Sequence, residues 1–386
     1  MSNKQALVDF ESTNSKPRIV IVCDWLIGGG AERVVEQLHK MYPEAPIYAS
    51  YCTNEWRQKL DGKVITGYLQ HWPFSRLRKF LPPLRALWFS HLNFDGYDLV
   101  ISSSGAEAKG IKTQRKTENG KRQTIHICYC HAPTHYYWSR YDDYLKNPGF
   151  GFFDPLARLG LRMLVGPMRR WDYKAAQRPD YLLANSTYTK EQIKKYYGRD
   201  SVVVHPPVDI ERFASKAEEP RRGFITAGRQ TPYKRIDLAV AACTKLNLPL
   251  VVLGSGPEHR RLKAMAGKTI TFLRGKSDEE VARYFQTSLA FIFPGVDDFG
   301  IVAVEALAAG TPVIAYKAGG ALDYIQPGKT GEFFNEPDAK SLSTVLQKFN
   351  PEKYNHTQIQ KSADQFSAAN FRSNFQQFVK KCLSNL

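Results

Sequence analysis

The sequence predicts an α/β protein made of two doubly wound domains that face a central cleft, and three observations support this prediction. The chain has 386 residues, more than one hydrophobic core usually organises. Short β-branched runs alternate with helical stretches, which is the pattern of parallel sheets covered by helices on both faces. The alternation stops once, near residues 206–220, and then starts again.

Each predicted strand is a short apolar run. These runs lie at 18–23, 98–102, 125–130 and 181–184 in the first series, and at 223–227, 249–253, 269–273, 289–293 and 311–316 in the second. A helix is predicted after Gly28 to Gly30, because the apolar residues from Val34 to Met41 recur at helical spacing.

The interruption between the two series divides the chain into parts. We expect a flexible N-terminus over residues 1–16, a first Rossmann-like domain over 17–210 and a second over 211–356. Residues 357–386 predict a terminal helix pair that packs back toward the first domain.

The composition is that of a globular protein with a strong basic excess. Lys and Arg number 54 against 37 Asp and Glu, which gives a formal net charge of +17. A nucleic-acid-binding protein is one interpretation of this charge. However, the basic residues accompany aliphatic ones and no known RNA or DNA module appears, so we expect no nucleic-acid partner.

The cysteines and the N-terminal segment bear on the compartment. Six cysteines at irregular spacing favour free thiols in a reducing compartment. The N-terminus lacks the apolar region of a signal peptide, and no run of about 18 apolar residues predicts a membrane-spanning helix. We therefore expect a cytoplasmic protein.

Two glycine-containing loops are candidate anion sites. Gly29 and Gly30 open a helix, where backbone N–H groups and the helix dipole favour a negative group, although an ordinary tight turn is equally compatible. Arg229 and Lys234 share the loop after strand 223–227, so they can flank a diphosphate. A solvated basic turn is the alternative, and the position at a strand's carboxyl end favours function.

The histidines of the stretch 128–138 are a second candidate. His131 ends a strand, where it can orient or hydrogen-bond a reacting group, and Pro133 is placed to open a helix. The alternative is a structural histidine. The pair His131 and His135 also suggests zinc, but Pro133 separates them and no third ligand stands at metal spacing, so we expect no metal.

Three carboxylates near residue 300 form the last candidate. Asp297 and Asp298 follow strand 289–293, and Glu305 lies in the helix that starts after Gly300. Carboxylates there can accept hydrogen bonds from sugar hydroxyls and are favoured by the helix dipole. For Glu305, capping of backbone N–H groups is the alternative.

Several motifs occur together in one order and spacing. They are G-G-A-E-R at 29–33, H-A-P at 131–133, ANSTYTKEQI at 184–193, HPPVDIERF at 205–213, G-R-x4-K at 228–234 and D-F-G-I at 298–301 with V-E-A at 304–306. Over about 18–345 the chain resembles the retaining GT-B glycosyltransferases of family 4, also called glycosyl transferases group 1. The run from 298 to 320 is most similar to bacterial mannosyltransferase-type members.

The resemblance implies roles for particular residues. The first domain would serve the acceptor and the second would bind the nucleotide sugar. Arg229 and Lys234 would hold the donor diphosphate, Glu305 the ribose, and His131 the transferred sugar. The remaining donor contacts would come from Gly29, Gly30, Arg274, Lys276, Asp297, Phe299, Gly300, Ile301 and Val302.

The resemblance also implies the reaction. We expect a retaining, metal-independent transfer without cofactor, with GDP-mannose as the first donor to consider and a glycan or lipid-linked acceptor, as in polysaccharide biosynthesis. The same fold also serves nucleotide-sugar epimerases and non-catalytic binding proteins, which are the alternatives.

The chain departs from the family at Asp297, where the E-x7-E motif begins with Glu. The side chain of Asp is shorter by roughly 1.5 Å, about one C–C bond. Either the loop moves inward, or water intervenes, or Asp298 contacts the sugar instead and Asp297 caps the helix.

Two stretches mix aromatic, aliphatic and basic residues. Residues 71–94 contain Arg76, Arg78, Lys79 and Arg85, and residues 150–174 contain Arg158, Arg162, Arg169 and Arg170. Such stretches suit an anionic membrane surface, so we expect peripheral association with the inner face of the cell membrane. Core-packed helices with basic residues reaching the surface are the alternative.

Overall fold

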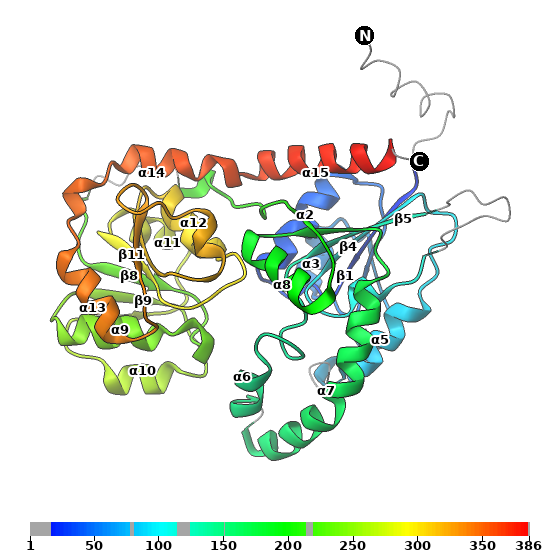
Figure 1. Ribbon diagram of the computed structural model, residues 1–386, viewed down its shortest axis with the longest axis horizontal. Coiled ribbons are helices and arrows are strands. Elements are labelled where there is room, and N and C mark those ends of the chain that lie inside the picture. The colour runs from blue at the N-terminus through cyan, green and yellow to red at the C-terminus, as the bar shows by residue number, and fades with distance from the viewer. Residues whose placement is uncertain (1–16, 78–80, 114–123, 150, 214–218, 385–386) are drawn as a thin grey trace, which may run out of the picture.

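The computed structural model describes residues 17–77, 81–113, 124–149, 151–213 and 219–384. The N-terminus predicted to be flexible, residues 1–16, lies outside the described residues, as do Arg78 and Lys79. Figure 1 shows two α/β domains side by side, with α14 (His356–Ser362) above the C-terminal domain and α15 (Ala368–Leu383) above the N-terminal domain. The predicted fold class is confirmed.

The N-terminal domain is built on a parallel sheet with the strand order β3-β2-β1-β4-β5-β6-β7. Its strands are β1 (Ile19–Cys23), β2 (Ile47–Ala49), β3 (Val64–Thr66), β4 (Leu99–Ser104), β5 (Ile125–Cys130), β6 (Tyr181–Ala184) and β7 (Val202–Val203). Its helices are α2 (Gly30–Met41), α3 (Asn54–Lys59), α4 (Phe74–Leu77), α5 (Pro82–His91), α6 (Tyr141–Lys146), α7 (Asp154–Ala176) and α8 (Thr187–Tyr197).

The buried strand β1 shows why its sequence is apolar throughout. Alternate side chains of a strand point to opposite faces of the sheet. Ile21 and Cys23 pack in the cluster that includes α2, whereas Val20 and Val22 pack with Phe89 of α5. Both faces are therefore covered, as a parallel sheet requires.

The C-terminal domain repeats this plan with the strand order β10-β9-β8-β11-β12-β13, again all parallel. The strands are β8 (Phe224–Ala227), β9 (Leu250–Leu253), β10 (Ile270–Leu273), β11 (Ala290–Phe293), β12 (Val313–Tyr316) and β13 (Gly331–Phe334). The helices are α9 (Ile236–Lys245), α10 (His259–Met265), α11 (Asp278–Gln286), α12 (Ile301–Ala308), α13 (Ala339–Lys348), α14 (His356–Ser362) and α15 (Ala368–Leu383).

The chain crosses between the domains twice. After β7, Val204 packs in the N-terminal core and Val208 in the C-terminal core. The return crossing leads into α15, whose Phe371 and Phe375 pack in the N-terminal core. The two crossing segments meet, because the backbone N–H of Val208 donates to the carbonyl of Phe366 at 2.9 Å.

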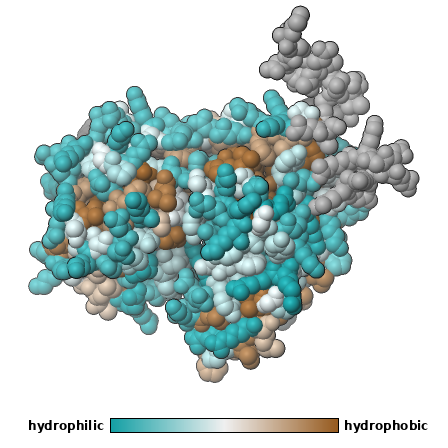
Figure 2. Space-filling view, in the orientation of Figure 1, coloured by the Kyte–Doolittle hydropathy of each residue, from teal (hydrophilic) through white to brown (hydrophobic). Residues whose placement is uncertain are grey.

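The two aromatic and basic stretches differ in the structure. In residues 71–94, Arg85, Trp88 and Phe89 are buried, although Trp72 is exposed. Residues 151–174 instead expose much of their apolar surface, with Phe152 93% and Met163 69% exposed. Hydrophobic residues (brown) lie beside hydrophilic ones (teal) at the lower end of Figure 2, where α6 and the start of α7 lie.

The described residues contain no helix that combines the length and the apolar character needed to cross a bilayer. The six cysteines are free and buried. Cys128 and Cys130 are alternate residues of β5, as their spacing predicts.

Candidate active site

The candidate residues gather where the strand order of each sheet reverses. In the N-terminal domain the reversal lies between β1 and β4, and in the C-terminal domain between β8 and β11. Open α/β sheets bind ligands outside the carboxyl ends of strands at such points. The two edges meet across the cleft, since His135 of one domain contacts Asp298 of the other.

A cation and a carboxylate pair at the C-terminal reversal. Lys234, in the loop after β8, donates to Asp297, in the loop after β11. Burial acts to lower the pKa of Lys234, but Asp297 opposes this effect and raises the pKa above its usual value. Lys234 therefore stays charged at neutral pH.

Arg140 of the N-terminal domain reaches the same cluster. Its guanidinium donates to the carbonyl of Val296 at 3.0 Å and lies 3.9 Å from the ring centroid of Tyr233. It is also 3.9 Å from a carboxylate oxygen of Asp297. No sequence pattern singles out Arg140, because only the fold brings residue 140 to the β8 and β11 loops.

The other predicted basic residues lie apart from this cluster. Arg229 follows β8 and is exposed. Arg274 is exposed after β10, and Lys276 pairs with Glu280 at 2.6 Å. The structure thus places them at carboxyl ends of strands without bringing them together.

Glu305 is buried in the second turn of α12 and faces the N-terminal domain. Arg33 of α2 donates to it at 2.8 Å, and Arg212 does so at 3.4 Å. Glu305 therefore joins two cations from different parts of the chain, which argues against the capping alternative. Neither arginine was selected from the sequence, although Arg33 belongs to the G-G-A-E-R motif.

The start of α2 packs closely on the start of α12. A Cβ added to Gly30 would lie 2.8 Å from the Cδ1 of Ile301, so a larger residue there would force the Ile301 side chain to move. Gly300, next to Ile301, has φ 89°, and a Cβ there would lie 2.7 Å from Phe293 and Tyr324. Gly29 directly precedes α2, and Val302 lies in the first turn of α12.

Phe299 serves the core with its side chain. Its ring is buried and packs against Tyr324 and Phe366. Only the backbone of Phe299 is therefore placed for contact with a ligand.

His131 directly follows β5 and is held by neighbours of its own domain. Its Nε2 lies 2.8 Å from the Oγ of Ser103, and its carbonyl accepts from Asn185. Burial lowers the pKa of His131 to about 4, against a smaller opposite effect of Asp298. The imidazole is therefore neutral at physiological pH. Pro133 does not open a helix, because residues 131–140 form turns and α6 begins only at Tyr141.

His135 binds a carboxylate. Its Nε2 lies 2.8 Å from Asp298 and its Nδ1 lies 2.9 Å from the Oγ of Ser139. Burial would raise the pKa of Asp298, but His135, Arg140 and Lys234 together outweigh burial and hold it below its usual value. Among the residues that the structure describes, no cluster of three potential metal ligands occurs.

Asp24 is a buried residue that the sequence analysis missed. Directly after β1, its carboxylate accepts from the backbone N–H groups of Gly105, Ala106 and Ala108 at 2.7 to 2.9 Å. Asp24 and His131 line a cavity of about 240 Å³. An acid placed directly after a fully apolar strand was the available signal.

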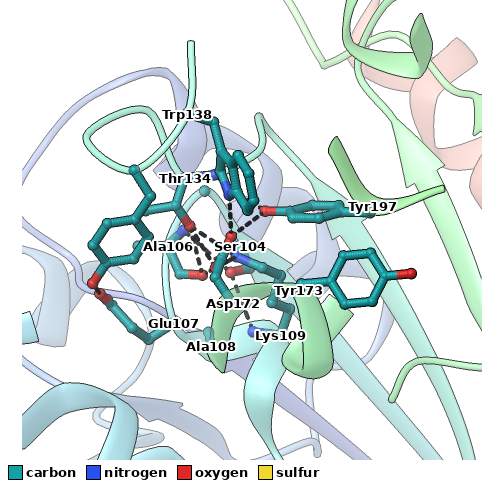
Figure 3. Close-up of polar contacts among 12 residues, drawn as sticks. Ser104, Ala106, Glu107, Ala108, Lys109, Thr134, Trp138, Asp172, Tyr173 and Tyr197 are labelled. Carbon is teal, nitrogen blue, oxygen red and sulfur yellow. Dashed lines mark hydrogen bonds and ion pairs between the residues drawn. The ribbon is translucent and has the colours of Figure 1, made fainter. Parts of the chain in front are cut away.

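A buried ion pair supports this half of the site. Figure 3 shows Asp172 of α7 among polar groups from several segments. Lys109 lies 2.7 Å from Asp172, which also accepts from Thr134, Trp138 and Tyr197 at 2.7 to 2.9 Å. The network ties the segment that holds His131 and His135 to α7 and α8.

Two protein-family models match successive parts of the chain. A family model described as "Glycosyltransferase Family 4" matches residues 28–212, and one described as "Glycosyl transferases group 1" matches residues 207–366. Together the two models cover most of both domains.

Two curated relatives illustrate the sequence similarity. A D-inositol 3-phosphate glycosyltransferase of Mycobacterium sp. (strain KMS) is 30% identical over 184 residues, which are 41% of this chain and 42% of the relative. A GDP-mannose-dependent alpha-(1-6)-phosphatidylinositol monomannoside mannosyltransferase of Mycolicibacterium smegmatis is 28% identical over 192 residues, 42% of this chain and 50% of the relative. The matched regions thus span half or less of these relatives.

Solved structures share the fold over nearly the whole chain. Anabaena HepE in complex with UDP has a TM-score of 0.66 at 16% identity and covers 96% of this chain and 100% of its own. The sucrose-phosphate synthase of Thermosynechococcus elongatus has a TM-score of 0.67 at 16% identity, with the same coverage. At this identity the likeness concerns the fold alone.

Proposed function

We propose that this chain, which belongs to the family 4 (group 1) glycosyltransferases and has the GT-B fold, moves a sugar from a nucleoside-diphosphate donor to a glycan or lipid-linked acceptor. The observation that carries the proposal is the meeting of two strand-end loops across one cleft. Arg140, in the segment after His131, lies 3.9 Å from Asp297, the partner of Lys234. The GDP-mannose-dependent relative supports mannose from GDP-mannose as the first donor to test.

In the proposed complex the C-terminal domain holds the donor. Lys234 and Arg229 neutralise the diphosphate from the end of β8, and the backbone from Gly300 to Val302 contacts it from the start of α12. Glu305 exchanges its ion pair with Arg33 for contacts with the ribose. Supporting this arrangement, these groups lie at the carboxyl ends of neighbouring strands and at the adjoining helix start.

Other proposed donor contacts lie around this centre. Arg274 and Lys276, after β10, lie beside the base. The backbone of Gly29 and Gly30 contacts a phosphate from the acceptor side, where α2 meets α12.

The proposed reaction proceeds on one face of the sugar. The bond from the anomeric carbon to the phosphate oxygen breaks while the acceptor hydroxyl oxygen bonds to the same carbon. The hydroxyl proton passes to the departing phosphate, so the anomeric configuration is retained. Lys234 and Arg229 stabilise the negative charge that develops there, and His131 hydrogen-bonds the sugar without carrying charge. With two cations supplied by the protein, the proposed transfer needs no metal.

The test is whether nucleoside diphosphate is released from GDP-mannose and UDP-glucose in the presence and absence of a bacterial lipid-extract acceptor. We expect release that requires the acceptor, persists in EDTA and forms an α-linked product. Conversion of the donor sugar without release would instead identify an epimerase. Nucleotide binding without conversion in either condition would identify a non-catalytic binding protein.

The proposal extends to the site of action, the cytoplasmic face of an anionic membrane. The apolar surface at the start of α7 supports it, because Phe152, Leu156 and Met163 are exposed together with Arg162 and Arg170. Aromatic and aliphatic side chains beside basic ones suit the interface of an anionic bilayer. Of the stretch 71–94, Trp72 and Arg76 remain available, whereas buried Arg85 and Trp88 do not.

Liposome flotation tests this extension. The double variant Arg162→Glu and Arg170→Glu should float less on phosphatidylglycerol vesicles, since each near-surface cation contributes about 1 kcal/mol at low salt. The matched control, Lys329→Glu with Lys348→Glu, changes the same charge on exposed residues of the C-terminal domain. Equal loss in both variants, or equal flotation on neutral vesicles, would contradict membrane association through α7.

A further inference from the structure

A large groove lies between the domains beside the candidate active site. It has a volume of about 730 Å³ and is lined by α6, the β8–α9 turn, α10 and the ends of β11 and β12. His135 and Asp298 line both this groove and the smaller cavity beside His131. The two spaces therefore meet at the His135–Asp298 pair.

The charged side chains of the groove are largely neutralised by one another. Arg235 lies 3.3 Å from Asp237, and Arg261 lies 2.5 Å from Glu258. His135 is hydrogen-bonded to Asp298 at 2.8 Å. A phosphate-rich ligand would have to break these pairs, whereas hydroxyl groups can donate to the carboxylates and accept from the guanidinium groups while the pairs persist.

Aromatic rings from both domains line the same groove. Tyr188 comes from the start of α8, Tyr233 from the β8–α9 turn and Tyr316 from the end of β12. Each ring is partly exposed. A sugar ring presents a C–H face as well as a rim of hydroxyls, so aromatic rings beside paired charges match both of its surfaces.

We propose that this groove binds the acceptor and that the acceptor is an oligosaccharide of neutral sugars, with its reactive end at the His135–Asp298 pair. The proposal rests on the proposed transferase function and names its acceptor class. The chain of sugars extends past Tyr188 toward α6. Because α6 packs against α7, the far end of the oligosaccharide leaves the groove near the apolar start of α7.

Calorimetric titration with manno-, gluco- and galactotriose, and with their methyl monosaccharides, tests the groove. At least one trisaccharide should bind more tightly than its monosaccharide, because it spans more of the lining. Tyr188→Ala should weaken that binding by roughly 2- to 10-fold, the value of one aromatic contact. Tyr173→Ala removes an exposed tyrosine of α7 that does not line the groove and should leave binding unchanged.

A second variant, at an exposed position, tests the groove in case Tyr188→Ala does not fold. Asn147 is an exposed groove residue, so Asn147→Trp fills the groove without disturbing a core and should abolish trisaccharide binding. Absence of binding for all three trisaccharides, or binding unaffected by both variants, would overturn the proposal. Tighter binding of tripolyphosphate, weakened by Arg261→Ala, would also overturn it, since the ligand would then be anionic.

Nucleotide binding separates this proposal from the transferase function. A thermal-shift titration with GDP and UDP is run on the same protein. If a nucleotide binds and no trisaccharide does, the groove proposal is wrong and the proposed transferase function is retained. If a trisaccharide binds in the groove and neither nucleotide does, the transferase falls and the groove remains a glycan site.

Discussion

The two halves of the candidate active site are held in different ways. In the N-terminal half, the carboxylates of Asp24 and Asp172 are satisfied by groups of their own domain, and so is the imidazole of His131. In the C-terminal half, Glu305 is paired with Arg33 across the cleft, and Asp297 is paired with Lys234 from the neighbouring loop.

The difference suggests a division of work. Contacts within one domain keep the N-terminal side chains in place whether or not a ligand is bound, which is the preorganisation that catalysis requires. Ion pairs across or along the cleft can be exchanged for a ligand's phosphate or hydroxyl groups. The N-terminal half should therefore respond to mutation mainly through stability, and the C-terminal half mainly through activity.

The largest effect is expected from Asp172→Ala. This change leaves the buried Lys109 ammonium without its counter-charge, which costs about 3–5 kcal/mol of unfolding free energy. Urea denaturation measures the loss. Asp200→Ala removes an exposed partner of Lys194 and should leave the denaturation midpoint unchanged. If both changes had the same effect, the N-terminal half would not be held by its buried network.

Lys234→Ala should have the next largest effect, and on turnover instead of stability. Turnover should fall at least about 100-fold, as when one preorganised charge donor is lost, and Arg229→Ala should act similarly. Steady-state kinetics with folded protein measures the loss. Wild-type turnover in both variants would contradict the proposal that Lys234 and Arg229 bind the diphosphate.

His131→Gln probes the neutral histidine through pH. Above pH 6.5 the imidazole is neutral in both folded and unfolded chains. Between pH 6.5 and about 4 only the unfolded chain takes up the proton, so the wild type loses about 1.4 kcal/mol of stability per pH unit. Urea denaturation at pH 7 and pH 5 should show a smaller loss in the variant. If the wild type and the variant lost the same stability between pH 7 and pH 5, His131 would not be held neutral in the folded protein.

The smallest effects separate Glu305 from Asp297. Glu305→Ala should weaken nucleoside diphosphate binding by about 1–3 kcal/mol, because a charge-assisted hydrogen bond to the ribose is lost. Asp297→Ala should lower turnover and leave nucleotide affinity nearly unchanged. Calorimetry and kinetics on both variants decide this.

The neighbouring carboxylate provides the control. If Asp298 contacts the sugar, Asp297→Asn keeps full activity and Asp298→Asn abolishes it. Asp297→Glu restores the residue usual in the family and should recover activity with the family's common sugar.

Much of the fold followed from the sequence, because strands buried on both faces must be apolar along their whole length. The strands from β4 to β6 and from β8 to β12 lie within two residues of their predicted bounds. The motif residues expected after strands, such as His131, Lys234 and Asp297, do follow β5, β8 and β11. Arg140 and Asp24 were missed, since their roles depend on contacts with segments distant in sequence.

The basic and aromatic stretches show a different limit. Arg85 and Trp88 resemble residues of an interface in composition, yet Arg85 is bonded to Glu107 inside the domain. Helical periodicity identifies the apolar face of a helix, but it does not tell whether the opposite face is exposed to solvent or buried against another part of the protein. The exposed half of α7 has the same composition, so only tertiary packing distinguishes the two stretches.

The paired crossing segments limit how the domains can move. The bond from Val208 to Phe366 joins the outgoing and returning chains side by side, in the C-terminal core where both residues pack. Rotation of the N-terminal domain about the crossing segments leaves this bond intact. Such a rotation would separate Arg33 from Glu305 and His135 from Asp298 together. Entry of a donor and access to the opposite side of the cleft would then be consequences of one angular displacement.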